Sequence, residues 1–145
     1  MSWKDEVEEI ERRRERARQG GGAEASAHQH ARGRLTVRER IEALVDSASF
    51  REIGALAGHA EPGAGGLPPE FTPASLVAGV ARIDGRLCVV AGDDFTLRGA
   101  AYSPAGLRKG LYAEEIAVAR RLPLPPPASR LPMLNKNLTY RSGEA

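Results

Sequence analysis

Two adjacent carboxylates, Asp93 and Asp94, are the side chains in this sequence best placed for acid–base or metal chemistry. They follow an apolar run at residues 87–91 that is typical of a buried strand. Loops at the carboxyl ends of strands are where α/β proteins bind ligands, so the position favours a functional role. The alternative is that an aspartate accepts hydrogen bonds from nearby backbone amides and shapes the turn. Residue chemistry alone favours this alternative.

Three histidines, His28, His30 and His59, are the remaining candidates for a metal site. No cysteine or acidic pair lies beside them in the sequence to complete a tetrahedral ligand set. Two residues that are two positions apart on a helix also point in different directions. We therefore expect solvated surface histidines and no metal ion.

An arginine-rich segment at residues 12–18 is similar in composition to a nucleic-acid-binding arm. Over residues 3–18, however, six acidic side chains offset six basic ones, and no aromatic side chain for base stacking lies among the arginines of residues 12–18. The whole chain carries 21 Lys and Arg against 19 Asp and Glu, which produces no strong field toward nucleic acid or anionic lipid. The segment is better interpreted as a salt-bridged helix face, with no nucleic-acid partner.

Cysteine usage and hydropathy indicate the compartment. The single cysteine, Cys88, excludes an internal disulfide, and its apolar neighbours favour an inert core residue over a nucleophile. The longest apolar run is far shorter than a bilayer span, and the charged N-terminus lacks a signal-peptide pattern. The expectation is a cytoplasmic chain with no membrane partner.

Helical patterns dominate the first third of the chain. Residues 3–19 carry a narrow apolar stripe and end at a triple glycine, after a capping-box-like start at Ser2 and Asp5. A weaker helix is expected over residues 23–32. Thr36 and Glu39 then form a clear capping box before a helix that ends near Asp46. A short extended piece follows at residues 50–56, and the glycine- and proline-rich residues 58–69 are expected to be a surface loop.

The strongest strand signal comes next. Residues 76–83 and 86–91 flank Asp84-Gly85, a dipeptide typical of a type I′ hairpin turn. A polar loop at residues 92–101 leads to Ser103 and Pro104, which predict a helix to about residue 122. That helix has two apolar stripes and is expected to be sandwiched between layers. The fold class is therefore α/β.

Several segments resemble one protein family. Residues 29–41 resemble the opening motif of carboxyltransferase (beta) subunits of biotin-dependent acyl-CoA carboxylases, of the propionyl-CoA, methylcrotonyl-CoA and acetyl-CoA carboxylase type. Residues 46–50, the hairpin at 79–90, Asp94-Phe95-Thr96 leading to Gly99, and a lysine at Lys109 agree in order. The resemblance covers roughly residues 20–124.

The resemblance implies a fold and a reaction. The fold would be an incomplete crotonase-like one, with N-terminal helices, a β-hairpin and a packed helix from its stacked ββα units, in a homo-oligomer. The reaction would transfer a carboxyl group from carboxybiotin to the α-carbon of an acyl-CoA. Biotin would be borne by a biotin carboxyl carrier acting with a biotin carboxylase subunit, so the chain would bind no cofactor directly. Backbone amides would stabilise the enolate that forms at the thioester.

The same resemblance implies where substrate binds. The loop bearing Phe95, Thr96, Gly99 and Ala100 would lie near acyl-CoA, and Lys109 would meet the CoA phosphates. No catalytic side chain is implied. Arg34 and Arg38 would be structural, and Asp94 would form the loop rather than act as a base.

The departures from the family predict a chain with three parts. These are a charged helix at residues 1–22, a partial carboxyltransferase N-terminal domain at 23–124 and a proline-rich, non-family tail at 125–145. Family members are several-fold longer, Ala100 replaces a second glycine, and Arg98 sits at a usually apolar position. We therefore expect a truncated carboxyltransferase that is inactive alone. The alternative is a non-catalytic module that docks on a full-length subunit.

Overall fold

The computed structural model describes residues 3–61, 70–101 and 103–125. The chain forms, in order, α1 (Trp3–Gln19), α2 (Ala23–Ala31), α3 (Val37–Leu44), β1 (Arg51–Ile53), β2 (Gly58–Glu61), β3 (Glu70–Pro73), β4 (Leu76–Ile83), β5 (Arg86–Asp93), a 3₁₀ turn η2 (Arg98–Ala100) and α4 (Pro104–Arg120). No helix in the described part is long and apolar enough to cross a membrane.

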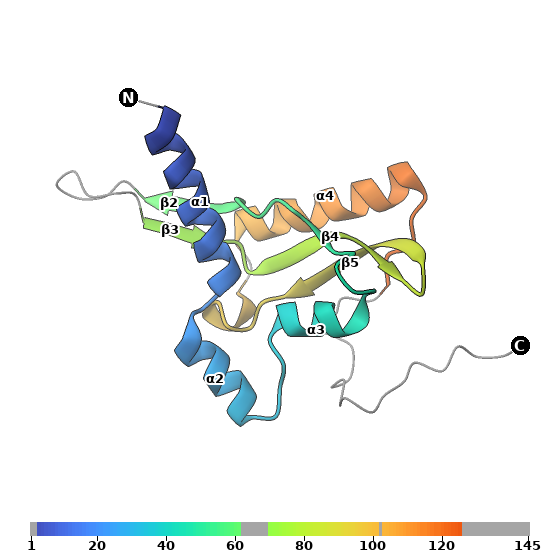
Figure 1. The fold of residues 1–145 in the computed structure, drawn as a ribbon, viewed down its shortest axis with the longest axis horizontal. Coiled ribbons are helices and arrows are strands. Elements are labelled where there is room, and N and C mark those ends of the chain that lie inside the picture. Colours follow the sequence, from blue (N-terminus) through green and yellow to red (C-terminus); the bar gives the residue numbers. More distant parts are fainter. Residues whose placement is uncertain (1–2, 62–69, 102, 126–145) are drawn as a thin grey trace, which may run out of the picture.

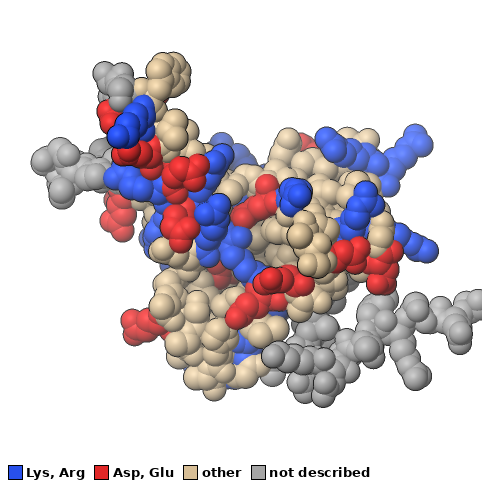
Figure 2. Space-filling model, in the orientation of Figure 1, with Lys and Arg blue, Asp and Glu red and all other residues tan. Residues whose placement is uncertain are grey.

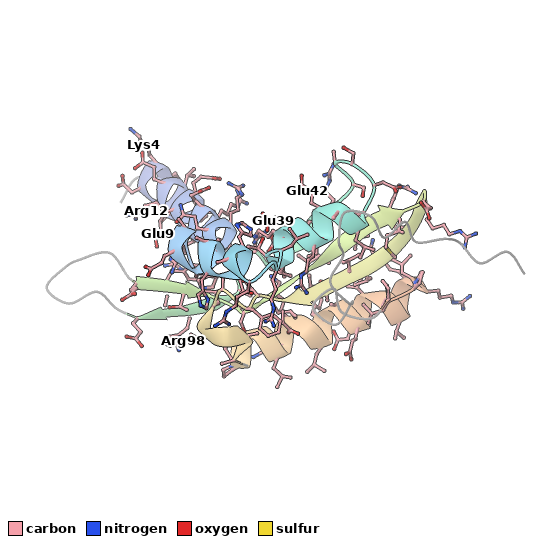
Figure 3. All side chains as sticks on the ribbon, turned by 90° about the horizontal axis from the view of Figure 1, so that it is seen from below. Lys4, Glu9, Arg12, Glu39, Glu42 and Arg98 are labelled. Carbon is pink, nitrogen blue, oxygen red and sulfur yellow. The ribbon has the colours of Figure 1, made fainter. Side chains whose placement is uncertain are left out.

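A three-stranded antiparallel sheet in the order β1-β4-β5 forms the centre of the molecule. Helices α1, α2 and α3 lie on one side of the strands and α4 lies on the other, as Figures 1 and 3 show. A second, two-stranded sheet of β2 and β3 contacts α1. The arrangement is an α/β layering. Side chains from both helical layers contact β1, an edge strand.

Each face of the central sheet has its own apolar core. On the α3 face, Val37 and Ile41 pack with Val77, Ala81, Cys88 and Val90. On the α4 face, Ala113 and Ala117 pack with Ala78 and Val89. Because β4 and β5 are covered on both faces, their residues show no apolar–polar alternation, as the sequence pattern of β5 indicated.

Helix caps are where the sequence predicted them. The Thr36 side chain accepts a hydrogen bond from the Glu39 amide, and the Glu39 carboxylate accepts one from the Thr36 amide, which completes the capping box. The Ser103 side chain caps α4 by accepting from the Gly106 amide, with Pro104 in the first turn. The predicted start of α1 at Ser2 lies outside the described residues.

The β4–β5 turn confirms the predicted hairpin. Asp84 and Gly85 have φ angles of 49° and 75°, the pair of positive values that a type I′ turn requires. The Asp46 carboxylate accepts hydrogen bonds from the Asp84 amide (2.9 Å) and the Gly85 amide (2.8 Å). The end of α3 is thereby attached to the hairpin tip.

The prediction of a surface loop across residues 58–69 is wrong at its start, because β2 is a strand paired with β3. Gly58 permits this pairing, since a Cβ there would lie 2.4 Å from the Thr72 carbonyl oxygen. Glycine lowers intrinsic strand preference, so the local sequence pointed to a loop. Residues 62–69 lie outside the described part, as do residues 126–145 of the predicted tail.

The prediction that α4 is sandwiched between layers is also wrong for this chain. Gly106, Ala113 and Ala117 are the small residues that face the sheet, while Leu107 and Leu111 are each about half exposed. Small side chains allow the helix axis to approach the strands closely. Leu107, Leu111, Tyr112 and Val118 therefore occupy the outward face, while Ile116 packs at the edge of the core.

Replacing Ile41 with alanine tests the core on the α3 face. Ile41 is 2 % exposed, so the substitution should lower the free energy of unfolding by ~2–5 kcal/mol through lost burial and a residual cavity. Urea denaturation measures this change. Leu107→Ala on the exposed face of α4 is the control and should cost less than about 1 kcal/mol. Equal losses for the two variants would contradict the core assignment.

Candidate functional site

A cleft of about 990 Å³ opens between the β2–β3 sheet and the first turns of α4. Its walls include Gly54, Pro73, Leu97, Arg98, Lys109 and Tyr112. The volume matches the ~300–1,000 Å³ of small-molecule and cofactor sites. Apolar and polar groups are mixed along the walls, so the cleft suits a ligand with both an apolar and a charged part.

Charge is distributed unevenly along the cleft. Arg98 and Arg108 line it beside the N-terminus of α4, and Figure 3 places Arg98 in the turn just before that helix. A helix N-terminus carries a partial positive charge, which adds to the two guanidinium groups. Glu61 and Glu70 line the cleft on the paired strands β2 and β3. An anionic ligand group is therefore favoured at the α4 end.

Three charged side chains meet at the edge strand beside the cleft. Glu52 on β1 accepts hydrogen bonds from Arg38 on α3 at 2.8 and 3.3 Å. The Lys109 ammonium on α4 donates to the same carboxylate at 3.3 Å. Only 5 % of the Lys109 side chain and 17 % of the Glu52 side chain are exposed. We call Arg38, Glu52 and Lys109 the ion triad.

The pKa values of the ion triad follow from burial and pairing. Burial raises the pKa of the Glu52 carboxyl, but the Arg38 hydrogen bonds and the two neighbouring cations outweigh it and hold the pKa below 4.5. Burial lowers the pKa of Lys109, and the Arg38 charge lowers it further, although Glu52 opposes both. The net result for Lys109 is a pKa below 10.5.

The loop after β5 is held by side-chain and backbone contacts. The buried Asp94 carboxylate accepts from the Thr96 amide at 3.0 Å and from the Thr96 hydroxyl. The Thr96 hydroxyl in turn accepts from the Gly21 amide at 2.9 Å, which joins the loop to the α1–α2 junction. A Cβ at Gly21 would lie 1.9 Å from the Thr96 carbonyl oxygen, so only glycine fits there. Asp94 is confirmed as a loop-forming residue.

Backbone geometry in η2 is unusual. Arg98, Gly99 and Ala100 have positive φ angles of 46°, 61° and 64°. For residues with a Cβ this region costs ~1–2 kcal/mol each, and such strain clusters at ligand-binding sites. Ser75 at the start of β4 donates to the Ala101 carbonyl at 2.8 Å and so holds the end of this turn at the cleft rim.

The predicted substrate-binding residues are divided between the cleft and its supports. Lys109 lines the cleft, whereas Thr96 is occupied in joining the loop to Gly21. Phe95 is 46 % exposed, and Gly99 and Ala100 lie in the strained turn whose neighbours Leu97, Arg98 and Ala101 line the cleft. Their contact with a substrate stays a prediction.

Sequence reasoning missed Glu52. The only signal in the sequence is a single carboxylate in an extended segment that mixes apolar and polar residues. Its two cationic partners lie 14 residues before it and 57 after it. Arg38 is held in the ion triad and also donates to the Ala17 carbonyl at 3.1 Å, which is consistent with the predicted structural role.

The histidines do not converge. His30 pairs with Glu39 at 2.9 Å and His59 pairs with Glu61 at 3.4 Å. Among residues 3–61, 70–101 and 103–125, no three His, Cys, Asp or Glu side chains are grouped as a metal site.

A family model described as the carboxyl transferase domain matches residues 28–126. The chain belongs to this family. The match begins in α2, spans the ion triad, the central sheet and α4, and ends just after the cleft-lining helix. The family resemblance that the sequence motifs predicted is thereby confirmed.

Curated proteins named as carboxylase beta chains are similar to this chain. A probable mitochondrial methylcrotonoyl-CoA carboxylase beta chain of Drosophila melanogaster is 41 % identical over 72 % of this chain and 18 % of its own length. A propionyl-CoA carboxylase beta chain of Cereibacter sphaeroides is 36 % identical over 83 % of this chain and 24 % of its own length. The chain therefore spans about a fifth of the length of such relatives.

Solved structures share the fold. A transcarboxylase 12S, described as a hexamer with methylmalonyl-coenzyme A bound, matches with a TM-score of 0.71 at 29 % identity, over 86 % of this chain and 24 % of that one. The beta subunit of Pseudomonas aeruginosa geranyl-CoA carboxylase matches with a TM-score of 0.59 at 32 % identity, over 76 % and 19 %. The α/β class and the partial crotonase-like fold are confirmed.

The ion triad predicts that acid lowers the stability of the fold. Because the folded-state pKa of Glu52 is depressed, its stabilisation is complete above the ordinary value of 4.5 and is lost as pH falls through the folded value. The free energy of unfolding, measured by urea denaturation, should decline below pH 4.5. Glu52→Gln should make that decline shallower, whereas Glu114→Gln on the exposed face of α4 should not. Parallel profiles for wild type and Glu52→Gln would contradict this account.

Proposed function

We propose that this chain is the acyl-CoA-binding part of the carboxyltransferase subunit of a biotin-dependent acyl-CoA carboxylase. The reaction of that subunit moves a carboxyl group from carboxybiotin to the α-carbon of an acyl-CoA. The observation that carries the proposal is the cleft, with its positive α4 end and Lys109 in its wall, in a chain of the carboxyl transferase family. Several relatives are named as beta chains of such carboxylases.

The charge distribution supports one position for the CoA phosphates. The phosphates lie toward Arg98, Arg108 and the α4 N-terminus, where two cations and the helix dipole attract anions. The loop bearing Phe95, Thr96, Gly99 and Ala100 also holds Arg98, and it therefore lies beside the bound acyl-CoA. Lys109 is the third cation for the CoA phosphates.

The wider assembly is proposed on the relatives' names. We infer that biotin arrives on a carrier protein loaded by a biotin carboxylase subunit, and that the chain works in a homo-oligomer, as the transcarboxylase hexamer does. The cytoplasmic location stays a prediction, because several relatives are named as mitochondrial.

We also propose that the isolated chain binds acyl-CoA without turning it over. Within the described residues, the glutamates that line the cleft are Glu61 and Glu70, which belong to the strand pair β2–β3 and not to the strained turn. The relatives named as carboxylases are about five times longer, which supports a site completed by further protein.

Binding of CoA tests the site directly. Isothermal titration calorimetry should detect CoA binding to the wild-type chain, and Arg98→Gln and Lys109→Met should each raise the Kd by ~10–100-fold, because each removes a charge-assisted hydrogen bond. Arg86→Gln, at the exposed hairpin end, is the matched control and should leave the Kd unchanged.

Two results would contradict the proposal. Equal loss of affinity in the Arg86→Gln control would show a general charge effect rather than a site. Carboxylation of propionyl-CoA by the isolated chain, with carrier and biotin carboxylase supplied, would show that it is active alone.

A specific feature favours the docking module as a second function. Trp3, Val7 and Ile10 form an apolar stripe on α1 and are 84 %, 54 % and 40 % exposed. This end of α1 extends beyond the strands in Figure 1, and Figure 2 shows acidic and basic side chains interleaved along it. An exposed stripe on a projecting, charge-paired helix suits docking on an apolar groove of a partner.

Fluorescence of Trp3 tests docking, because it is the only tryptophan in the chain. If α1 docks on a full-length carboxyltransferase subunit whose own tryptophans are replaced, emission should shift to the blue as the indole leaves water. Val7→Ser should weaken the interaction about tenfold or more, since it removes ~2 kcal/mol of apolar burial. Glu8→Gln is the control on the same helix. An unchanged spectrum at saturating subunit would exclude this function.

A further inference from the structure

Lys109 is held at two points along its side chain. Its stem packs on Gly54, where an added Cβ would lie 3.6 Å from the Cγ, Cδ and Cε carbons of the lysine. Its ammonium donates to Glu52 at 3.3 Å. With 5 % of the side chain exposed, water solvates this cation poorly, so its position and its charge depend on the carboxylate.

Glu52 is itself held firmly. Arg38 donates to its two carboxylate oxygens, and Arg38 is fixed in turn by the Ala17 carbonyl at the end of α1. Such a two-point Arg–carboxylate contact restricts the direction of the carboxylate as well as its distance. The oxygen that faces Lys109 is therefore set by contacts from α3 and α1.

The ion triad keeps a positive charge at the cleft. Two cations and one anion sum to a net charge of +1, so pairing with Glu52 does not cancel the attraction of an anionic ligand. The other titratable groups in the cleft lining are Arg108 and Tyr112 on the same helix, Arg98 in η2, His59 and Glu61 on β2, and Glu70 on β3.

We propose that Glu52 is a positioning residue of the cleft, whose carboxylate, directed by Arg38, places the Lys109 ammonium and keeps it protonated for a phosphate-bearing ligand. The identity of the ligand rests on the proposed function, but the control of Lys109 by Glu52 does not. The two substitutions that follow act on Lys109 in opposite directions, which general damage to the fold would not do.

Titration of Lys109 by NMR tests the proposal without any ligand. The chain has three lysines, Lys4, Lys109 and Lys136, so lysine labelled with ¹³C at Cε gives three signals, and Lys109→Arg identifies the one of interest. Glu52→Gln should lower the Lys109 pKa relative to wild type, because the carboxylate that favours the ammonium is gone. Arg38→Gln should raise it, because a repelling cation is gone and Glu52 pairs with Lys109 alone.

Binding of CoA at several pH values gives the second measurement. Affinity in Glu52→Gln should begin to fall at a lower pH than in wild type, with a loss of about tenfold once Lys109 is neutral in the variant. Glu52→Asp, which keeps the charge, should restore most of the wild-type profile. Circular dichroism confirms that each variant is folded.

The outcomes separate the two proposals. Opposite shifts of the Lys109 pKa in the two variants, with no CoA binding by wild type, would uphold the positioning role and overturn the acyl-CoA site. Shifts in the same direction, or none, would overturn the positioning role whatever binds. If Glu52→Gln fails to fold, the Lys109 pKa in Arg38→Gln tests the positioning role. A pKa that does not rise in that variant would overturn the role.

Discussion

A cation that is almost fully removed from water is the constraint on which the site depends. Burial disfavours the charged form of Lys109, and Glu52 on the edge strand β1 opposes this effect with a carboxylate beside the ammonium. Glu52 also binds Arg38, so the ion triad joins α3 on one face of the sheet to α4 on the other. Removing Glu52 would leave both cations without their carboxylate. The position of α4 beside the cleft is therefore coupled to the position of α3.

The α1–α2 junction contacts the cleft region at two separate points. The Ala17 carbonyl holds Arg38, and the Gly21 amide holds Thr96 in the loop after β5. Both contacts use backbone groups at a helix end, which have no partners within the helix. A docked α1 would consequently stabilise the ion triad and the strained turn together. This links the projecting apolar stripe of α1 to the cleft region.

Packing on α4 shows why this helix has one buried face and one exposed face. Small residues bring the helix onto β4 and β5, and the leucine-bearing stripe is left outward. The chain covers about a fifth of its longer relatives, and the exposed stripe is apolar enough to bury against further protein.

Local chemistry in the sequence determined much of the fold. The Thr36–Glu39 capping box, the Asp84-Gly85 turn, the Ser103–Pro104 helix start and the loop role of Asp94 all depend on residues within a few positions of each other. The motifs shared with the family also predicted the crotonase-like fold. Tertiary structure alone decided the β2–β3 pairing, the outward face of α4 and the meeting of Glu52 with Lys109. These contacts join residues far apart in the chain, and no periodicity or propensity encodes which distant partner a strand, a helix face or a carboxylate meets.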